Sequence, residues 1–292
     1  MSTLSPQHGR AASNPSPGSA TLHATIAPTT GYAIRLVNVS RSFGPQIVLD
    51  GVNINIPRGQ TTVIMGPSGC GKSVMLKHIV GLLQPSSGEV WVEDQRIDQL
   101  RERDLVPIRL QIGFLFQLSA LFDSMSVADN IAFPLIEHTT LTESQRRDKI
   151  HHALELVDLD GVEHKLPAQL SGGQRKRVAL ARAIVLEPRI ILYDEPTTGL
   201  DPIRSDGIDQ LVNKLRKELG VTSVVVTHDM NSARKVAEHC FLLLNGKVAA
   251  QGTFEQLQQN PDFRVQQFLQ GVYRRDDIEA ERPSTPGQAA SL

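Results

Sequence analysis

The residues that most clearly suggest chemistry form a glycine-rich loop, Gly66-Pro67-Ser68-Gly69-Cys70-Gly71-Lys72-Ser73. Its spacing is that of a phosphate-binding loop, in which glycines let backbone N–H groups turn inward around phosphate oxygens. Lys72 can neutralise the β- and γ-phosphates of a nucleotide, and Ser73 can ligate Mg²⁺. Cys70 is interpreted as a small filler residue or, alternatively, as a redox-sensitive thiol. The loop predicts a nucleoside triphosphate site.

A second candidate is the acidic pair Asp194-Glu195, which ends the apolar run 190–193. At the carboxyl end of a parallel strand, such a pair can face the phosphate site. Asp194 would then hold Mg²⁺, and Glu195 would polarise the attacking water. The alternative is an acidic turn before Pro196. The phosphate-binding loop elsewhere in the chain favours the catalytic interpretation.

The segment Leu170-Ser171-Gly172-Gly173-Gln174 predicts the start of a helix. Ser171 and Gln174 have the spacing of a capping box, and the helix is expected to continue through residues 175–186. The exposed N–H groups at its start suit a second anion. This pentapeptide is the signature of the ABC-type ATPases, which the chain resembles from about Tyr32 to Leu269.

The resemblance assigns roles to four further residues. Phe43 takes the position of the aromatic that stacks on adenine, where the family often has tyrosine. Gln117 matches the glutamine that approaches Mg²⁺ and the attacking water. Asp201 ends the Gly199-Leu200-Asp201 segment that lies at the nucleotide, and His228 matches the histidine that contacts the γ-phosphate.

The resemblance also implies a homodimer in head-to-tail contact around two ATP molecules. Each ATP would lie between the Lys72 loop of one subunit and residues 171–174 of the other. Closure would depend on intact ATP, so that hydrolysis opens the dimer. Because Glu195 is present, both sites of the homodimer are expected to hydrolyse ATP.

Within the ABC-type ATPases, the chain is most similar to transporter subunits. It has no coiled coil of the kind that DNA-repair members carry, and one copy of each motif where translation-associated members have two. The membrane domains are therefore expected on separate chains. Residues 117–134 are expected to form much of the groove that receives a coupling helix, with ordinary packing of the helical insert as the alternative.

Three segments, 114–127, 132–139 and 260–271, are similar to the Mla-type (MlaF-like) phospholipid transport ATPases. That similarity implies phospholipid transport between inner and outer membranes, at the cytoplasmic side of a bacterial inner membrane. It implies three partners: an integral-membrane permease (MlaE-like), a lipid-binding subunit of the MCE type (MlaD-like) and a small STAS-domain protein (MlaB-like). The alternatives are a small-solute importer, for example for amino acids, an organellar lipid importer and an adaptor without ATPase activity.

The elements that must position these residues follow from the hydrophobic pattern. Strands are expected at 34–39, 52–56, 61–65, 112–116, 190–193 and 221–226. A helix is expected from Thr142, because Thr142 and Gln145 form a capping box and Ile150, Leu154 and Val157 recur at helical spacing. The sequence predicts an α/β fold: a mostly parallel sheet, an antiparallel β edge subdomain and a helical insert, about 126–187, carrying the signature.

Composition limits the function further. Lys+Arg 30 against Asp+Glu 31 gives a net charge of −1, which argues against a nucleic-acid partner. Two cysteines favour neither a disulfide framework nor a zinc site. Residues 1–30 are interpreted as a disordered tail, with a transit peptide as the alternative. Residues 31–271 are interpreted as the ATPase domain and 272–292 as a second tail. The apolar residues of 263–273 predict a helix docked on this chain's core or on a partner ATPase.

Overall fold

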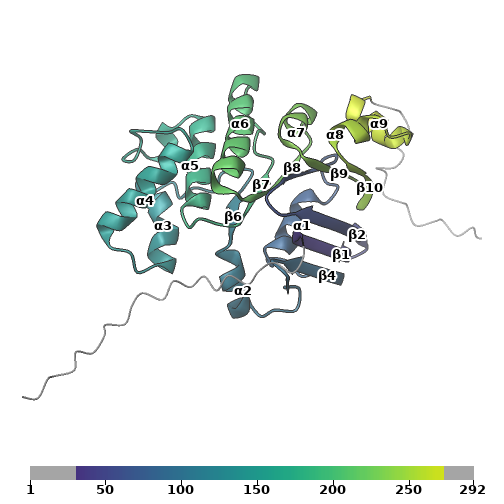
Figure 1. Cartoon of the computed structure of the whole chain (residues 1–292), viewed down its shortest axis with the longest axis horizontal. Helices are drawn as coiled ribbons and strands as arrows, with labels where there is room; N and C mark the ends of the chain where they lie inside the picture. The colour runs from purple at the N-terminus through teal and green to yellow at the C-terminus, as the bar shows by residue number, and fades with distance from the viewer. Residues whose placement is uncertain (1–30, 273–292) are drawn as a thin grey trace, which may run out of the picture.

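The structure is a computed structural model that describes residues 31–272 (Figure 1). The predicted N-terminal tail lies outside the described residues, as does the C-terminal tail after Val272. Within the described residues, none of the helices combines the length and the apolar character needed to span a bilayer.

A six-stranded sheet forms the centre of the molecule, in the order β10-β9-β3-β8-β7-β6. Its strands are β3 (Thr61–Met65), β6 (Ile112–Leu115), β7 (Ile190–Asp194), β8 (Thr222–Thr227), β9 (His239–Leu244) and β10 (Lys247–Gly252). All neighbours are parallel except β10, which pairs antiparallel with β9. Every residue of β3, β7 and β8 is buried, because layers cover both faces of a parallel sheet. The predicted mostly parallel core is confirmed.

A smaller antiparallel sheet has the order β2-β1-β4-β5. Its strands are β1 (Tyr32–Phe43), β2 (Gln46–Pro57), β4 (Ser87–Val92) and β5 (Gln95–Arg96). Val52, Ile54 and Ile56 are all buried, as their alternation predicts. β1 and β2 are 12 residues each, longer than the predicted strands. Register shifts along the β1–β2 pair let pairing continue past the polar residues that interrupt the alternation.

Helices cover both faces of the central sheet. These are α1 (Lys72–Ile79), α2 (Glu102–Arg109), α6 (Pro202–Leu219), α7 (Met230–Val236), α8 (Phe254–Gln258) and α9 (Phe263–Gln270). Met75, Leu76 and Ile79 of α1 share one buried cluster with Ile34 and Leu36 of β1, so α1 packs between the two sheets. Helices α6 and α7 contribute to the cluster on the other face.

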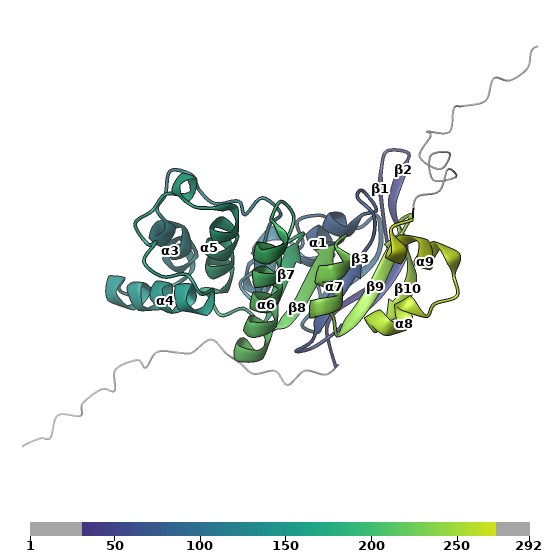
Figure 2. The ribbon, with the colours of Figure 1, turned by 90° about the horizontal axis from the view of Figure 1, so that it is seen from above.

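The remaining helices form a lobe at one end of the molecule, seen in both views (Figures 1 and 2). It contains α3 (Val127–His138), α4 (Glu143–Leu156), the short 3₁₀ turn η1 (Pro167–Gln169) and α5 (Gly172–Ile184). The predicted capping boxes of Thr142 and Ser171 are both present. Helix α5 ends at Ile184, two residues earlier than predicted, because Glu187 adopts a left-handed backbone (φ 55°) and Pro188 follows.

The C-terminal helix α9 docks on this chain's own core. Val265 is fully buried, and Phe268 and Leu269 pack against the same cluster. Phe263 and Val272 were expected to take part in docking, but they are 59% and 47% exposed. The reason is helical geometry: Val265, Phe268 and Leu269 share one face at three- and four-residue spacing, whereas Phe263 lies off it.

Candidate nucleotide-hydrolysis site

The glycine-rich loop connects β3 to α1 at the carboxyl end of β3. A Cβ at Gly66 would lie 2.4 Å from the carbonyl oxygen of Leu243, and Gly71 has φ 105°. Only glycine fits both positions, because one lacks space and the other requires a left-handed backbone. Gly71 caps α1 without a side-chain hydrogen bond. The first N–H groups of α1 are therefore available to an anion.

Lys72 is held in the mouth of this loop with only 6% of its side chain exposed. Its Nζ donates to the carbonyl oxygens of Gly66 at 2.8 Å and Pro67 at 3.0 Å. It also lies 3.5 Å from Oε1 of Glu195. The ammonium is thus positioned where phosphate oxygens would replace the loop carbonyls as its partners.

Ser73 and Asp194 meet at the base of the loop. Ser73 Oγ donates to Asp194 Oδ1 at 3.0 Å. Burial raises the pKa of Asp194 above its ordinary value, and the Ser73 hydrogen bond opposes that rise. Hydroxyl and carboxylate oxygens are the ligands that Mg²⁺ prefers, commonly completed by substrate phosphates and water. Ser73 and Asp194 are therefore side chains of the type that would hold a nucleotide-bound Mg²⁺.

Glu195 connects the loop to His228. Its Oε2 lies 2.9 Å from His228 Nδ1 and accepts a hydrogen bond from Thr198 Oγ1 at 3.2 Å. Its backbone is left-handed (φ 49°), and its N–H donates to Val226 O at 3.0 Å. A non-glycine residue in this conformation stores strain, which at a site often serves to aim a side chain. Here the carboxylate is aimed between an ammonium and an imidazole.

Topology explains why these groups meet. The Lys72 loop follows β3, and His228 follows β8. Asp194 is the last residue of β7, and Glu195 comes directly after it. β8 pairs with both β3 and β7, and the carboxyl ends of parallel strands open at one edge. Three segments far apart in the sequence therefore deliver their side chains to one place.

Gln117 and Phe43 have exposed side chains in this structure. Gln117 follows β6, and its side chain is exposed and has no hydrogen bond among the described residues. Its carbonyl oxygen instead accepts a hydrogen bond from Lys176. Phe43 is 45% exposed, with the Arg41 guanidinium stacked 4.6 Å from its ring centroid. An adenine would stack on the face of the Phe43 ring opposite Arg41.

The signature segment lies apart from the loop. Residues 171–174 begin α5 in the helical lobe, and α6 and β7 lie between α5 and α1 in both views (Figures 1 and 2). Ser171 Oγ accepts from Gln174 N at 3.3 Å, and Gln174 Oε1 accepts from Ser171 N at 3.0 Å. Cβ atoms added at Gly172 and Gly173 would lie 3.5 and 3.6 Å from side chains of Leu200 and Arg204. The structure does not bring this segment to its own Lys72 loop.

Asp201 is the N-cap of α6. Its Oδ1 accepts hydrogen bonds from Ile203 N at 3.1 Å and Arg204 N at 3.0 Å. The Arg204 N–H above all holds the pKa of Asp201 below its ordinary value. The Asp-Pro pair at a helix start could have indicated this capping role.

Sequence reasoning missed Lys176 and Thr198. Thr198 lies three residues after Glu195. In a tight turn, residues at this spacing lie close together, so the spacing could have indicated the hydrogen bond between them. Lys176 lies three residues after Gly173 and four before Leu180, so it shares the buried face of α5 with them. A charged residue on the apolar face of a helix was the available signal.

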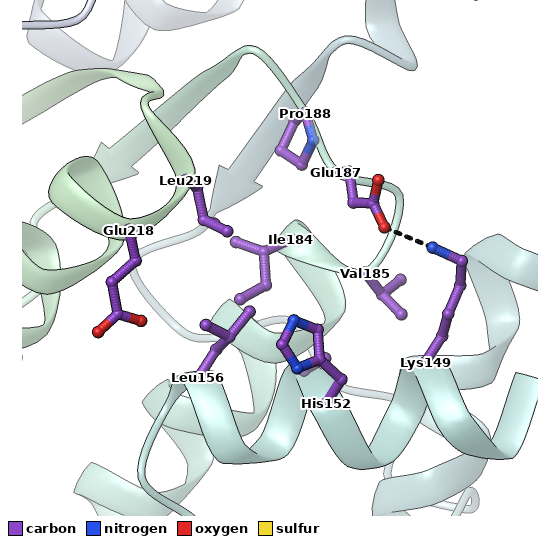
Figure 3. Close-up of a pocket in the computed structure, with 10 residues that line it drawn as sticks. Lys149, His152, Leu156, Ile184, Val185, Glu187, Pro188, Glu218 and Leu219 are labelled. Carbon is purple, nitrogen blue, oxygen red and sulfur yellow. Dashed lines mark hydrogen bonds and ion pairs between the residues drawn. The ribbon is translucent and has the colours of Figure 1, made fainter.

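A separate pocket of about 300 Å³ lies among the ends of α4, α5 and α6 (Figure 3). Leu156, Ile184 and Leu219 line it, and Lys149 and Glu187 form an ion pair of 2.5 Å at its rim. Pro188, which precedes β7, lines it as well. The pocket therefore lies at the amino end of β7, opposite the end that carries the acidic pair.

Comparison with known proteins gives a family and several relatives. The family model for ABC transporters matches residues 49–198. The chain is 43% identical over 238 residues to the Haemophilus influenzae "Intermembrane phospholipid transport system ATP-binding protein MlaF", covering 82% of this chain and 90% of that one. It is 42% identical to the Escherichia coli K12 protein of the same name over 235 residues, covering 80% and 87%.

Two other comparisons add to this. The chain is also 43% identical over 241 residues to the "Probable ribonucleotide transport ATP-binding protein mkl" of Mycobacterium leprae, covering 82% of this chain and 70% of that one. Among solved structures, a dimeric bacterial ABC transporter cassette, MJ0796, aligns with a TM-score of 0.71 and 38% identity, covering 75% of this chain and 98% of that one. A second MJ0796 dimer, bound to ADP and Pi, aligns with a TM-score of 0.70.

Proposed function

The chain belongs to the ABC transporter family, and on that premise we propose that it is the ATP-hydrolysing subunit of a transporter that moves phospholipid between two membranes. The family and its ATP-binding cassette structures support ATP hydrolysis. The observation that carries the chemistry is the position of the Glu195 carboxylate, in contact with both Lys72 and His228.

In the proposed reaction, Lys72 exchanges the carbonyls of Gly66 and Pro67 for phosphate oxygens of ATP. Ser73 and Asp194 would hold Mg²⁺, with Gln117 approaching from the β6 side, and the ion would neutralise charge on the phosphates. Glu195 polarises the attacking water and His228 contacts the γ-phosphate. Phe43 stacks on the adenine.

Two chains are needed in this proposal. The signature segment 171–174 and Asp201 of one subunit would meet the ATP held by the Lys72 loop of the other. Support comes from the separation of the two segments within one chain and from the dimeric cassettes with which the chain aligns. Both sites of the homodimer carry Glu195, so both would hydrolyse ATP.

The cargo assignment rests on the relatives. The Haemophilus MlaF and the probable ribonucleotide transport protein of Mycobacterium leprae are equally similar to this chain, at 43% identity. The chain spans 90% of the Haemophilus MlaF but 70% of the mycobacterial protein. The nearly full-length match favours phospholipid, and ribonucleotide is the second candidate.

A membrane permease would dock on an exposed apolar surface that follows β6. Phe122 and Phe133 are 42% and 37% exposed, with ring centroids 5.1 Å apart, and Leu118 is 90% exposed. We place the chain peripherally on the cytoplasmic side of a bacterial inner membrane, with MlaE-, MlaD- and MlaB-like partners. Residues 31–271 would form the ATPase domain, with 126–187 as its helical insert between two tails.

One experiment tests the cargo and the partners together. The detergent-solubilised complex is isolated from its native membrane through this chain, and mass spectrometry identifies its proteins and lipids. A permease, an MCE-type subunit and bound phospholipid are the expected result. A permease with a soluble solute-binding protein, or one that carries ribonucleotide, would overturn the phospholipid assignment and leave the ATP chemistry intact.

The chemistry has its own test. Glu195→Gln keeps the shape of the side chain but removes the carboxylate. We expect the variant to bind ATP, to hydrolyse it at least about a hundredfold more slowly and to accumulate as a closed dimer. Turnover at the unmodified rate would remove Glu195 from the proposed role.

A further inference from the structure

Lys176 is a buried cation that the proposed reaction does not use. It lies on α5, five residues after Ser171, and is 5% exposed. No carboxylate of the described residues lies within ion-pair distance of it. Its Nζ donates instead to two backbone carbonyls, those of Gln117 and, at 3.4 Å, Glu195. Burial lowers the pKa of Lys176, opposed by the charges of Asp194 and Glu195.

Burying an ammonium is costly, and an apolar side chain would fill the same space at lower cost. The Gln117 carbonyl would then lose its side-chain donor, and the Glu195 carbonyl would retain only the backbone N–H of Thr198 among the donors of the described residues, at 3.3 Å. Since each is held by the same nitrogen, Lys176 ties three segments together: the start of α5, the residues after β6 and the turn after β7.

The contact fixes the main chain of Glu195 on both sides. Its N–H donates to Val226 O of β8, and its carbonyl accepts hydrogen bonds from Thr198 N at 3.3 Å and from Lys176 of α5 at 3.4 Å. With φ at 49°, the residue is in a conformation that its surroundings must impose. A small rotation of this peptide would move the carboxylate away from Lys72 and His228.

The same helix holds the segment after β6 at a second point. Arg182 donates to the carbonyl oxygen of Ser119 at 3.1 Å, two residues after the carbonyl that Lys176 holds. Between the two anchored carbonyls lies Leu118, 90% exposed. A partner that contacts Leu118 therefore binds a segment whose Gln117 and Ser119 carbonyls are both hydrogen-bonded to α5.

We propose that Lys176 is a positioning residue for hydrolysis, which holds the main chain of Glu195 at a fixed position relative to the Gln117 segment. A contact of the partner with Leu118 is thereby transmitted to the Glu195 carboxylate. This rests on the proposed role of Glu195. Hydrolysis depends on the exact position of the Glu195 carboxylate, whereas ATP binding depends mainly on the Lys72 loop. Loss of the Lys176 hydrogen bonds should therefore lower turnover and leave ATP affinity nearly unchanged.

The first test compares Lys176→Met, Lys176→Gln and Arg177→Met in the complete membrane complex. Lys176→Met keeps the volume and removes the donors, and we expect kcat to fall at least about tenfold while KM and ATP binding change less than about twofold. Lys176→Gln restores a donor and should recover part of kcat. Arg177→Met is the matched control, since Arg177 also donates from α5 to a backbone carbonyl, that of Val157, away from the site.

The outcomes separate the two proposals. If Glu195→Gln is inactive while Lys176→Met keeps full kcat, the positioning role is wrong and the role of Glu195 stands. If Lys176→Met and Arg177→Met lose kcat equally, or if Lys176→Gln matches Lys176→Met, the effect is general destabilisation and the proposal fails. If Glu195→Gln is fully active, the proposed function itself fails.

A double-mutant cycle tests the connection to the partner surface. Leu118→Ala is expected to lower the stimulation of ATPase activity by the membrane subunits. In the Lys176→Met background it should cause little further loss, because the Lys176 hydrogen bonds that transmit the contact are already absent. Strictly additive losses would overturn the transmission from Leu118.

Discussion

Two parts of the candidate site differ in how far one chain completes them. Around Lys72, a network of hydrogen bonds and ion pairs joins the phosphate loop, the end of β7 and the residue after β8. The signature segment 171–174 carries its own capping box and lies against the side chains of Leu200 and Arg204. In the proposed site, one chain therefore joins the groups around Lys72, whereas we propose that the signature segment meets the nucleotide held by a second copy of the chain.

The difference follows from the elements that carry each part. Adjacent parallel strands deliver their carboxyl ends to one edge, so the chemistry around Lys72 assembles when the sheet forms. The signature lies in a lobe whose position is set by α3, α4 and α5 packing on one another. In the proposed site, its nucleotide therefore comes from another copy of the chain.

Subunit mixing gives the largest test of this difference. Lys72→Ala and Ser171→Arg should each lower ATPase activity at least about a hundredfold. In a mixed dimer of the two variants, one site has an intact Lys72 and an intact signature, so activity should return. ATP hydrolysis of purified mixtures is the measurement.

The control for mixing uses two defects in the same half-site. A mixture of Lys72→Ala and Glu195→Gln leaves every site broken, because Lys72 and Glu195 act from the same chain. It should remain inactive. Recovery in this mixture, or none in the first, contradicts the division between chains.

His228→Ala should have the next largest effect. It removes the imidazole that lies 2.9 Å from Glu195 Oε2, and with it a contact to the γ-phosphate. We expect kcat to fall about a hundredfold. ATP affinity should be nearly unchanged, because Lys72 and the loop N–H groups remain; nucleotide titration and steady-state kinetics separate the two, and a loss confined to affinity would count against the assignment.

Ser171→Ala and Thr142→Ala form a matched pair at two capping boxes, on α5 and α4. Each should lower the free energy of unfolding by about 1 kcal/mol, because an N-terminal N–H loses its acceptor. Only Ser171→Ala should also lower ATPase turnover, since only that hydroxyl would meet ATP. Urea unfolding and ATPase rates measure both; equal turnover in the two variants would assign Ser171 a capping role alone.

The smallest effect is expected at Asp158, which joins the lobe to α6. Lys214 donates to it at 2.6 Å and Arg177 lies 3.3 Å away. The Lys214 hydrogen bond holds the pKa of Asp158 below its ordinary value. The stabilisation is therefore present above the unfolded-state pKa and is lost as pH falls through the folded-state pKa.

Asp158→Asn should lower the free energy of unfolding near neutral pH by about 0.2–1 kcal/mol, the range for exposed pairs, since 58% of this side chain is exposed. The difference from the unmodified protein should shrink as pH falls below the ordinary Asp pKa of about 3.9 and vanish once pH lies below the lowered pKa of folded Asp158. ATPase activity should not change. A difference that is constant across pH would exclude the ion pairs as its cause.

Much of the central fold could be predicted from local pattern. The continuous apolar runs became β3, β7 and β8 because a strand covered on both faces needs no polar side. The outer elements were less predictable. The lengths of β1 and β2 depend on register shifts between them, and the exposure of Phe263 depends on which face of α9 meets the core.

By itself, the sequence determined the groups that could do the chemistry: the phosphate loop with Lys72, the acidic pair and the signature. Their spacing is local, and local geometry of turns and helix starts is encoded within a few residues. Only the tertiary structure decided that Glu195 lies between Lys72 and His228, and that Lys176 reaches its carbonyl. These contacts join residues from 19 to 123 positions apart, and their distances exist only once the sheet and the helical lobe have packed together.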